Sequence, residues 1–242
     1  MKSILTVIFS LAFCFVLLSP ACAQQNELPF KELSMRFEVN HTDGDGEVVI
    51  SFVSRLVWEK NLNIYASVVE LLERNGVPHR RLIVGDGPAR GELQARLPDA
   101  IFTGHLSGES LAYTYAASDI FLFPSDTETF GNVTLEAMAS GVPTVCADAT
   151  GSAGLVLHGE TGFLAPSGNK RGFFRYTEML ATDPLLRAKM AVAARRQASR
   201  YDWDSTLSKL IGYYDEILNP GVETSVGVDK RRAVTQDAIL QA

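Results

Sequence analysis

Short apolar runs alternate with amphipathic stretches between residues 47 and 218. The apolar runs are rich in β-branched and aromatic residues and are bounded by turn-forming residues, a pattern that predicts buried strands. The predicted strands are EVVISFVS (47–54), RLIVG (81–85), AIFTG (100–104), DIFLFPS (119–125), PTVCAD (143–148) and the short GFLAP (162–166).

The stretches between these runs carry the spacing of helices. The first of them, NLNIYASVVELLERNG, stops at Asn75-Gly76 in the manner of a helix C-terminus. Strands that alternate with helices form a parallel sheet covered on both faces, so the fold class is α/β: a Rossmann-like doubly wound parallel sheet of about six strands. Ligands bind such sheets at the carboxyl ends of the strands. The predicted helices are residues 61–76, 89–97, 110–118, 133–141, 173–180, 184–199 and 204–218.

The N-terminus has the pattern of a secretory signal peptide. Lys2 supplies the positive charge, Ile4–Leu18 is an uncharged apolar run, and Ala21–Ala23 is a small-x-small cleavage site. The apolar run is shorter than the roughly 20 residues that a spanning helix needs, which argues against a permanent membrane anchor. The predicted division of the chain is a leader (1–23), a linker (24–46), a Rossmann-like domain (47–218) and a mobile tail (219–242).

Composition and charge exclude several classes of function. The 242 residues carry a net charge of −6, which argues against a non-specific nucleic-acid binder. Of the three cysteines, only Cys146 lies outside the leader, in the apolar run VPTVCA, where a buried, inert thiol is expected. The chain has no H-x-x-H motif and no Cys/His cluster, so the sequence predicts no metal site and no metal cofactor.

The segment SDTETFGNVTLEAMASGVP, residues 125–143, joins a predicted strand to a predicted helix and holds the first candidate chemistry. Gly131 lets the backbone approach a ligand, and the free amides of Phe130–Val133 point out of the helix N-terminus, which makes a site for a diphosphate. Glu136, one turn into the helix, is near enough to accept hydrogen bonds from a ribose diol, and Glu128 precedes the loop. Alone, either glutamate would be read as a solvated charge.

This segment resembles the E-x7-E motif of the family 4 retaining glycosyltransferases, which have the GT-B architecture. Other segments are similar to the same family, in its order and at plausible spacing, and together they cover about residues 47–218, its C-terminal donor-binding domain. These segments are FVSRLVWEKNL, RLIVGDGP, FTGHL, DIFLFPS and HGETGFLAPSGN.

The resemblance implies a role for each matching residue. Arg55 and Lys60 match the basic pair that binds the donor diphosphate and stabilises the leaving nucleotide. Glu128 matches the glutamate that contacts the transferred sugar, and Glu136 matches the one that holds the ribose hydroxyls. The implied substrate is a UDP- or GDP-linked hexose, transferred with retention to an unknown acceptor. The other implied donor-binding positions are Phe130, Gly131, Asn132, Val133, Gly104, His105 and Leu106.

Three further features have simpler readings. The run LIVGDGPARG resembles a dinucleotide-binding fingerprint, but Pro88 follows its second glycine and no second strand ends in an acidic residue about 20 positions later. We read Gly85 and Gly87 as a tight turn near the site. His105 lies in a predicted donor loop, and His158 is expected to be structural.

The matching segments do not include the family's acceptor-binding domain. Three hypotheses follow. The chain is a donor-binding half that works with a separate acceptor-binding subunit, an inactive truncated copy, or an exported module that binds a nucleotide or sugar without catalysis. The leader predicts a secreted or periplasmic protein, whereas nucleotide sugars are normally made in the cytosol. A misassigned start would make the protein cytoplasmic.

Overall fold

The computed structural model describes residues 47–201 and 203–218. The predicted leader (1–23), linker (24–46) and tail (219–242) lie outside the described residues, so these assignments stay predictions.

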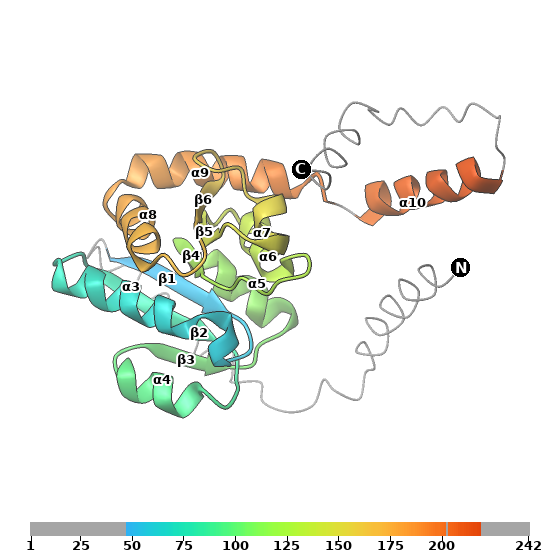
Figure 1. Ribbon diagram of the computed structural model, residues 1–242. Coiled ribbons are helices and arrows are strands. Elements are labelled where there is room, and N and C mark those ends of the chain that lie inside the picture. The colour runs from blue at the N-terminus through green and yellow to red at the C-terminus, as the bar shows by residue number, and fades with distance from the viewer. Residues whose placement is uncertain (1–46, 202, 219–242) are drawn as a thin grey trace, which may run out of the picture. The chain divides into compact units, whose positions relative to one another are not determined.

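One six-stranded parallel sheet forms the centre of the described domain (Figure 1). The strand order is β3-β2-β1-β4-β5-β6, and every neighbouring pair is parallel. This arrangement confirms the predicted doubly wound α/β class. The strands are β1 (Val48–Val53), β2 (His79–Val84), β3 (Ile101–Gly104), β4 (Ile120–Phe123), β5 (Thr144–Ala147) and β6 (Gly162–Ala165).

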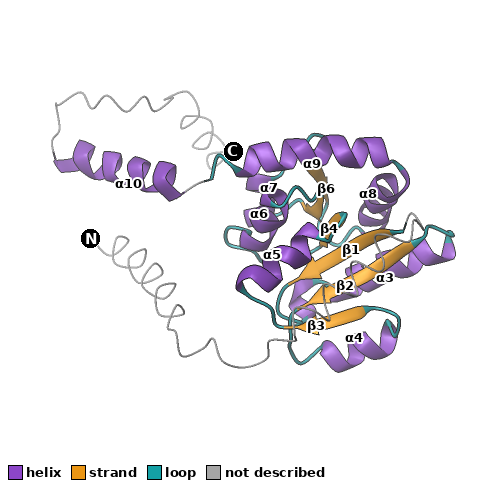
Figure 2. Cartoon of the chain, turned by 180° about the vertical axis from the view of Figure 1, so that it is seen from behind, coloured by secondary structure: helices purple, strands orange, loops and turns teal. Residues whose placement is uncertain are grey.

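Helices cover both faces of the sheet (Figures 1 and 2). Helices α3 and α8 pack together on one face, and α6 packs against α9 and against β4 and β5 on the other. No helix in the described part of the chain is long and apolar enough to span a membrane. The helices are α3 (Leu62–Arg74), α4 (Arg90–Arg96), α5 (Gly108–Ala116), α6 (Asn132–Ala139), α7 (Thr150–Leu155), α8 (Lys170–Thr182), α9 (Pro184–Ala198) and α10 (Trp203–Leu218), with a 3-10 turn, η3 (Trp58–Lys60), before α3.

The core is built from strand residues that are buried on both faces of the sheet. All six residues of β1 are buried, and the Phe52 ring lies 5.7 Å from the Phe123 ring of β4. The Tyr65 ring of α3 packs edge-on against the Phe52 ring. The Tyr65 hydroxyl donates to the Ile50 carbonyl oxygen at 3.1 Å. Burial of each such side chain contributes about 1.5–3 kcal/mol, so this aromatic contact ties α3 to the central strands.

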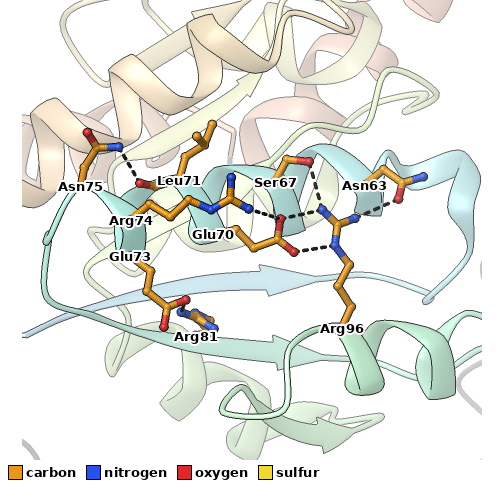
Figure 3. A network of polar contacts seen from close by, with 9 residues as sticks. All are labelled: Asn63, Ser67, Glu70, Leu71, Glu73, Arg74, Asn75, Arg81 and Arg96. Atoms are coloured by element: carbon orange, nitrogen blue, oxygen red, sulfur yellow. Dashed lines mark hydrogen bonds and ion pairs between the residues drawn. The ribbon is translucent and has the colours of Figure 1, made fainter.

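A network centred on Arg96 joins α4 to α3 (Figure 3). The Arg96 guanidinium donates to both carboxylate oxygens of Glu70, at 2.6 and 2.9 Å, and also to Ser67 and Asn63. A two-pronged contact of this kind fixes the orientation of both side chains. The Arg96 hydrogen bond lowers the pKa of the Glu70 carboxyl below its usual value of 4.5.

Replacing Glu70 with glutamine should lower the free energy of unfolding by about 1 kcal/mol at about pH 7, since the contact is partly exposed. A carboxyl whose folded-state pKa is depressed contributes stability above its unfolded value, and that stability is lost as the pH falls through the folded pKa. The difference between Glu70→Gln and the parent should therefore shrink below pH 4.5.

Urea unfolding of both proteins at about pH 7 and about pH 3 measures this difference. Glu92→Gln, at an exposed position of α4, the helix that carries Arg96, is the control and should change stability by less than about 0.5 kcal/mol. A Glu70→Gln effect that is equal at both pH values would contradict an ionic contribution.

Candidate functional site

The strand order reverses direction between β1 and β4. Strand β1 pairs with β2 on one side and with β4 on the other, so the loops that follow β1 and β4 start side by side at the carboxyl edge of the sheet. Such a switch point is where doubly wound sheets bind ligands. The sequence-predicted residues Arg55 and Lys60 follow β1, and Glu128 follows β4.

A tight turn after β2 supports the loop after β1. The amide of Ser54 donates to the Val84 carbonyl at 3.1 Å, and the amide of Leu56 donates to the Asp86 carbonyl at 2.9 Å. Gly85 and Gly87 have φ values of 130° and 157°, and a Cβ atom at Gly85 would lie 1.8 Å from the Ser54 carbonyl oxygen. The glycines of the dinucleotide-like run therefore serve a close backbone contact that positions the Arg55 loop.

Lys60 and Glu128 meet across the switch point. The Lys60 ammonium lies 2.6 Å from Glu128 Oε1, and the two side chains are only 15% and 18% exposed. Thr127 and Ser125 complete the cluster, at 3.3 Å from Lys60 Nζ and 3.1 Å from Glu128 Oε1. An ammonium has three donors, so Lys60 can hold Glu128 and still donate to an incoming anion.

Two side chains that the sequence analysis missed fix these loops. Asn61, in a left-handed conformation with φ 55°, donates from Nδ2 to the Pro124 carbonyl at 2.9 Å. Asp126 accepts a hydrogen bond from Ser167 in the loop after β6, and this bond lowers the pKa of the Asp126 carboxyl. The available signal was the position of Asp126 just after a predicted strand and of Asn61 at the start of a predicted helix, where polar side chains bind neighbouring backbone.

The N-terminus of α6 lies on the same edge and has no side-chain cap. Gly131 precedes it with φ 90°. Gly151 of α7 packs so closely that a Cβ there would lie 2.3 Å from the Phe130 carbonyl carbon. Asn132 is exposed and Val133 half-buried, so the first amides of the helix remain available to an anion.

Glu136 lies exposed on the first turns of α6, and one of its oxygens is held. Oε2 accepts a hydrogen bond of 3.0 Å from the Tyr115 hydroxyl of α5. Partial burial raises the pKa of the Glu136 carboxyl, and the Tyr115 hydrogen bond opposes that rise. Since the side chain keeps a large exposed fraction, the carboxylate remains accessible to a ligand.

The remaining predicted site residues lie around this cluster. Arg55 is exposed in the loop after β1. Gly104, with φ 78°, accepts a hydrogen bond of 2.7 Å from the Gly85 amide, which places the loop after β3 beside the turn after β2. In that loop His105 is exposed and Leu106 is half-buried. Lys60 and Glu128 are therefore in direct contact, and Gly104 is hydrogen-bonded to the turn that supports the Arg55 loop.

Two residues with potential chemistry are structural in this fold. His158 accepts a hydrogen bond from the Leu164 amide and packs against the Phe163 and Tyr176 rings, as its structural reading predicted. Cys146 is fully buried in β5, and burial raises the pKa of its thiol to about 11, which makes it unreactive. Among the side chains that the structure describes, no group of three or more metal-ligating residues gathers.

The arrangement therefore offers a cation, two carboxylates and an uncapped helix start at one edge of the sheet. A family model for glycosyl transferases group 1 matches residues 47–183, more than half of the chain. The chain belongs to this glycosyl transferase family. The predicted resemblance to GT-B glycosyltransferases is confirmed.

Similar proteins agree with this assignment. The GDP-mannose-dependent alpha-mannosyltransferase of Mycolicibacterium smegmatis is 38% identical over 175 residues, covering 72% of this chain and 44% of that protein. The sulfoquinovosyl transferase SQD2 of Arabidopsis thaliana is 34% identical over 187 residues, covering 75% of this chain and 36% of that protein. This glycosyl transferase chain thus spans less than half the length of these curated relatives.

A solved structure shares the fold. Anabaena Alr3699/HepE, in complex with UDP-glucose, superposes with a TM-score of 0.63 at 25% identity, covering 75% of this chain and 51% of that one. The α/β sheet of this family member therefore has the architecture of known glycosyltransferases.

Proposed function

We propose that the domain described here binds a nucleotide sugar, a UDP- or GDP-linked hexose, as the donor of a retaining glycosyl transfer. The observation that carries the proposal is the contact of 2.6 Å between Lys60 and Glu128 across the switch point, beside the uncapped start of α6. This contact supports the proposal because a cation that could bind phosphate lies beside a carboxylate that could bind a sugar hydroxyl. The similarity to a GDP-mannose-dependent mannosyltransferase supports the same substrate class.

The diphosphate is proposed to lie on the amides of Phe130–Val133, with Lys60 and the exposed Arg55 beside it. Helix N-termini attract anions because their free amides and the helix dipole both favour negative charge. In a glycosyl transfer, negative charge grows on the diphosphate as the sugar–phosphate bond breaks. Fixed cations and amides at that place lower the barrier.

Glu128 is proposed to contact the transferred sugar. Lys60 and Ser125 both bind its Oε1, so the carboxylate has a defined orientation before any donor arrives. Preorganised groups of this kind cost no rearrangement during the reaction. Glu136 is proposed to receive the ribose hydroxyls, and Gly104, His105 and Leu106 are proposed to lie beside the base.

Isothermal calorimetry of the full chain tests the proposal. GDP or UDP should bind with a Kd below about 1 mM, and NAD should bind more weakly by at least about tenfold, because the GDG turn is occupied by a backbone contact. GDP-mannose and UDP-glucose, measured in the same way, identify the preferred base and sugar. Binding of NAD with no binding of GDP, UDP or either sugar nucleotide would refute the proposed donor site.

A further inference from the structure

The buried hydroxyl of Tyr115 has no role in the proposed donor site so far. Tyr115 lies in α5 and is 2% exposed, with its ring edge-on to Phe121 of β4 at 6.0 Å. Phe121 in turn stacks on Phe123 at 5.4 Å. The ring is therefore fixed by the aromatic core, and the position of its hydroxyl is set by that packing.

This fixed hydroxyl donates to a carboxylate that is otherwise free to move. Glu136 is exposed on α6, and a glutamate side chain loses about 1.5–2 kcal/mol of rotamer freedom when it is held in one conformation. The 3.0 Å hydrogen bond from Tyr115 holds Oε2. Among the side chains of residues 47–201, none donates a hydrogen bond to the other oxygen, Oε1, so it is available to a ligand.

We propose that Tyr115 is a positioning residue, which holds Glu136 with one carboxylate oxygen ready for the vicinal hydroxyls of the nucleotide ribose. The inference rests on the proposed function and deepens it, because it assigns the preference for a ribonucleotide to a residue that does not touch the ligand. Without the hydroxyl, Glu136 would sample several rotamers, and each ribose hydrogen bond would require the carboxylate to be ordered first.

The test compares each nucleoside diphosphate with its 2′-deoxy counterpart. The full-length parent should bind GDP or UDP about tenfold more tightly than the deoxy form, a typical loss for one hydrogen bond to a charged group. In Tyr115→Phe this preference should fall to about threefold or less, while the affinity for the deoxy form changes by less than about twofold. On a Glu136→Gln background, Tyr115→Phe should change the preference no further.

Tyr65→Phe is the matched control. Tyr65 is also a fully buried tyrosine, but its hydroxyl donates to the Ile50 carbonyl oxygen, in the core. Losing that hydroxyl should lower stability and leave the ribose preference unchanged. An equal loss of preference in Tyr65→Phe and Tyr115→Phe would mean that the effect comes from weakened packing, which overturns the proposal.

The possible results distinguish a failure of the Tyr115 role from a failure of the proposed donor site. A parent that binds neither GDP nor UDP refutes the donor site itself, and the role of Tyr115 with it. A parent that shows the ribose preference together with a Tyr115→Phe variant that retains it refutes only the inference. If Tyr115→Phe does not fold, Glu136→Asp replaces it, since the shorter side chain draws the carboxylate away from the hydroxyl. An unchanged preference in Glu136→Asp overturns the proposal.

Discussion

Replacing Lys60 with alanine should weaken the binding of GDP or UDP by about 1–3 kcal/mol, or roughly 5- to 150-fold, the range for losing a charge-assisted contact. Lys60 is 15% exposed, so the lost contact is weakly screened by solvent. Calorimetry of parent and variant measures the change. Lys189→Ala removes an exposed cation from α9 and should leave the affinity within about twofold of the parent.

Lys60 also holds Glu128, and a second variant separates the two roles. Glu128→Gln should leave the GDP and UDP affinities within about threefold of the parent, because these ligands lack the sugar that Glu128 is proposed to contact. A Glu128→Gln loss as large as that of Lys60→Ala would show that Lys60 acts through Glu128. Equal affinities in Lys60→Ala and the parent would remove Lys60 from the diphosphate site.

Replacing Gly85 with alanine should lower the free energy of unfolding by about 3–5 kcal/mol, the sum of backbone strain and overpacking. The new Cβ would lie 1.8 Å from the Ser54 carbonyl oxygen, and φ is 130°. Because Ser54 begins the loop that carries Arg55 and Lys60, nucleotide affinity should fall as well. Urea unfolding and calorimetry on the same preparation measure both effects.

Gly76→Ala is the control for backbone strain alone. Gly76 also has a positive φ, 70°, but a Cβ there would meet nothing within 4 Å. Its cost should be about 1 kcal/mol, the penalty of a left-handed alanine. If Gly76→Ala and Gly85→Ala destabilise the protein equally, the close contact between Gly85 and Ser54 does not contribute.

Most of the fold could be predicted from the sequence because the strands are continuous apolar runs. The predicted strand at 119–125 is β4 (Ile120–Phe123), and the predicted helix at 184–199 is α9 (Pro184–Ala198). Helix α7 was missed because its sequence, TGSAGL, contains two glycines and little apolar periodicity. One of these glycines, Gly151, allows the backbone of Phe130 to pack against α7. The same glycine therefore weakens the helix pattern in the sequence and is needed for the packing of the candidate site.

The candidate site was harder to predict, because its contacts join loops that are distant in sequence. Lys60 and Glu128 are 68 residues apart, and their ion pair depends on β1 and β4 being neighbours, which periodicity does not reveal. The Tyr115 hydroxyl was also missed. Its helix pattern places the ring in the core but does not show which polar group on α6 faces it. The individual roles of Arg55, Glu128 and Glu136 remain predictions.

The central position of β1 has a consequence for synthesis on the ribosome. Of the six described strands, β1 is made first, yet one of its two partners is made much later, since the Val49 amide binds the Asp119 carboxylate 70 residues further along. At roughly 5–20 residues per second, the apolar edge VVISFV waits about 4–14 s for β4. An unpaired edge of that composition favours intermolecular pairing. We therefore expect aggregation during synthesis, as well as the stability of the finished domain, to limit the yield of soluble protein.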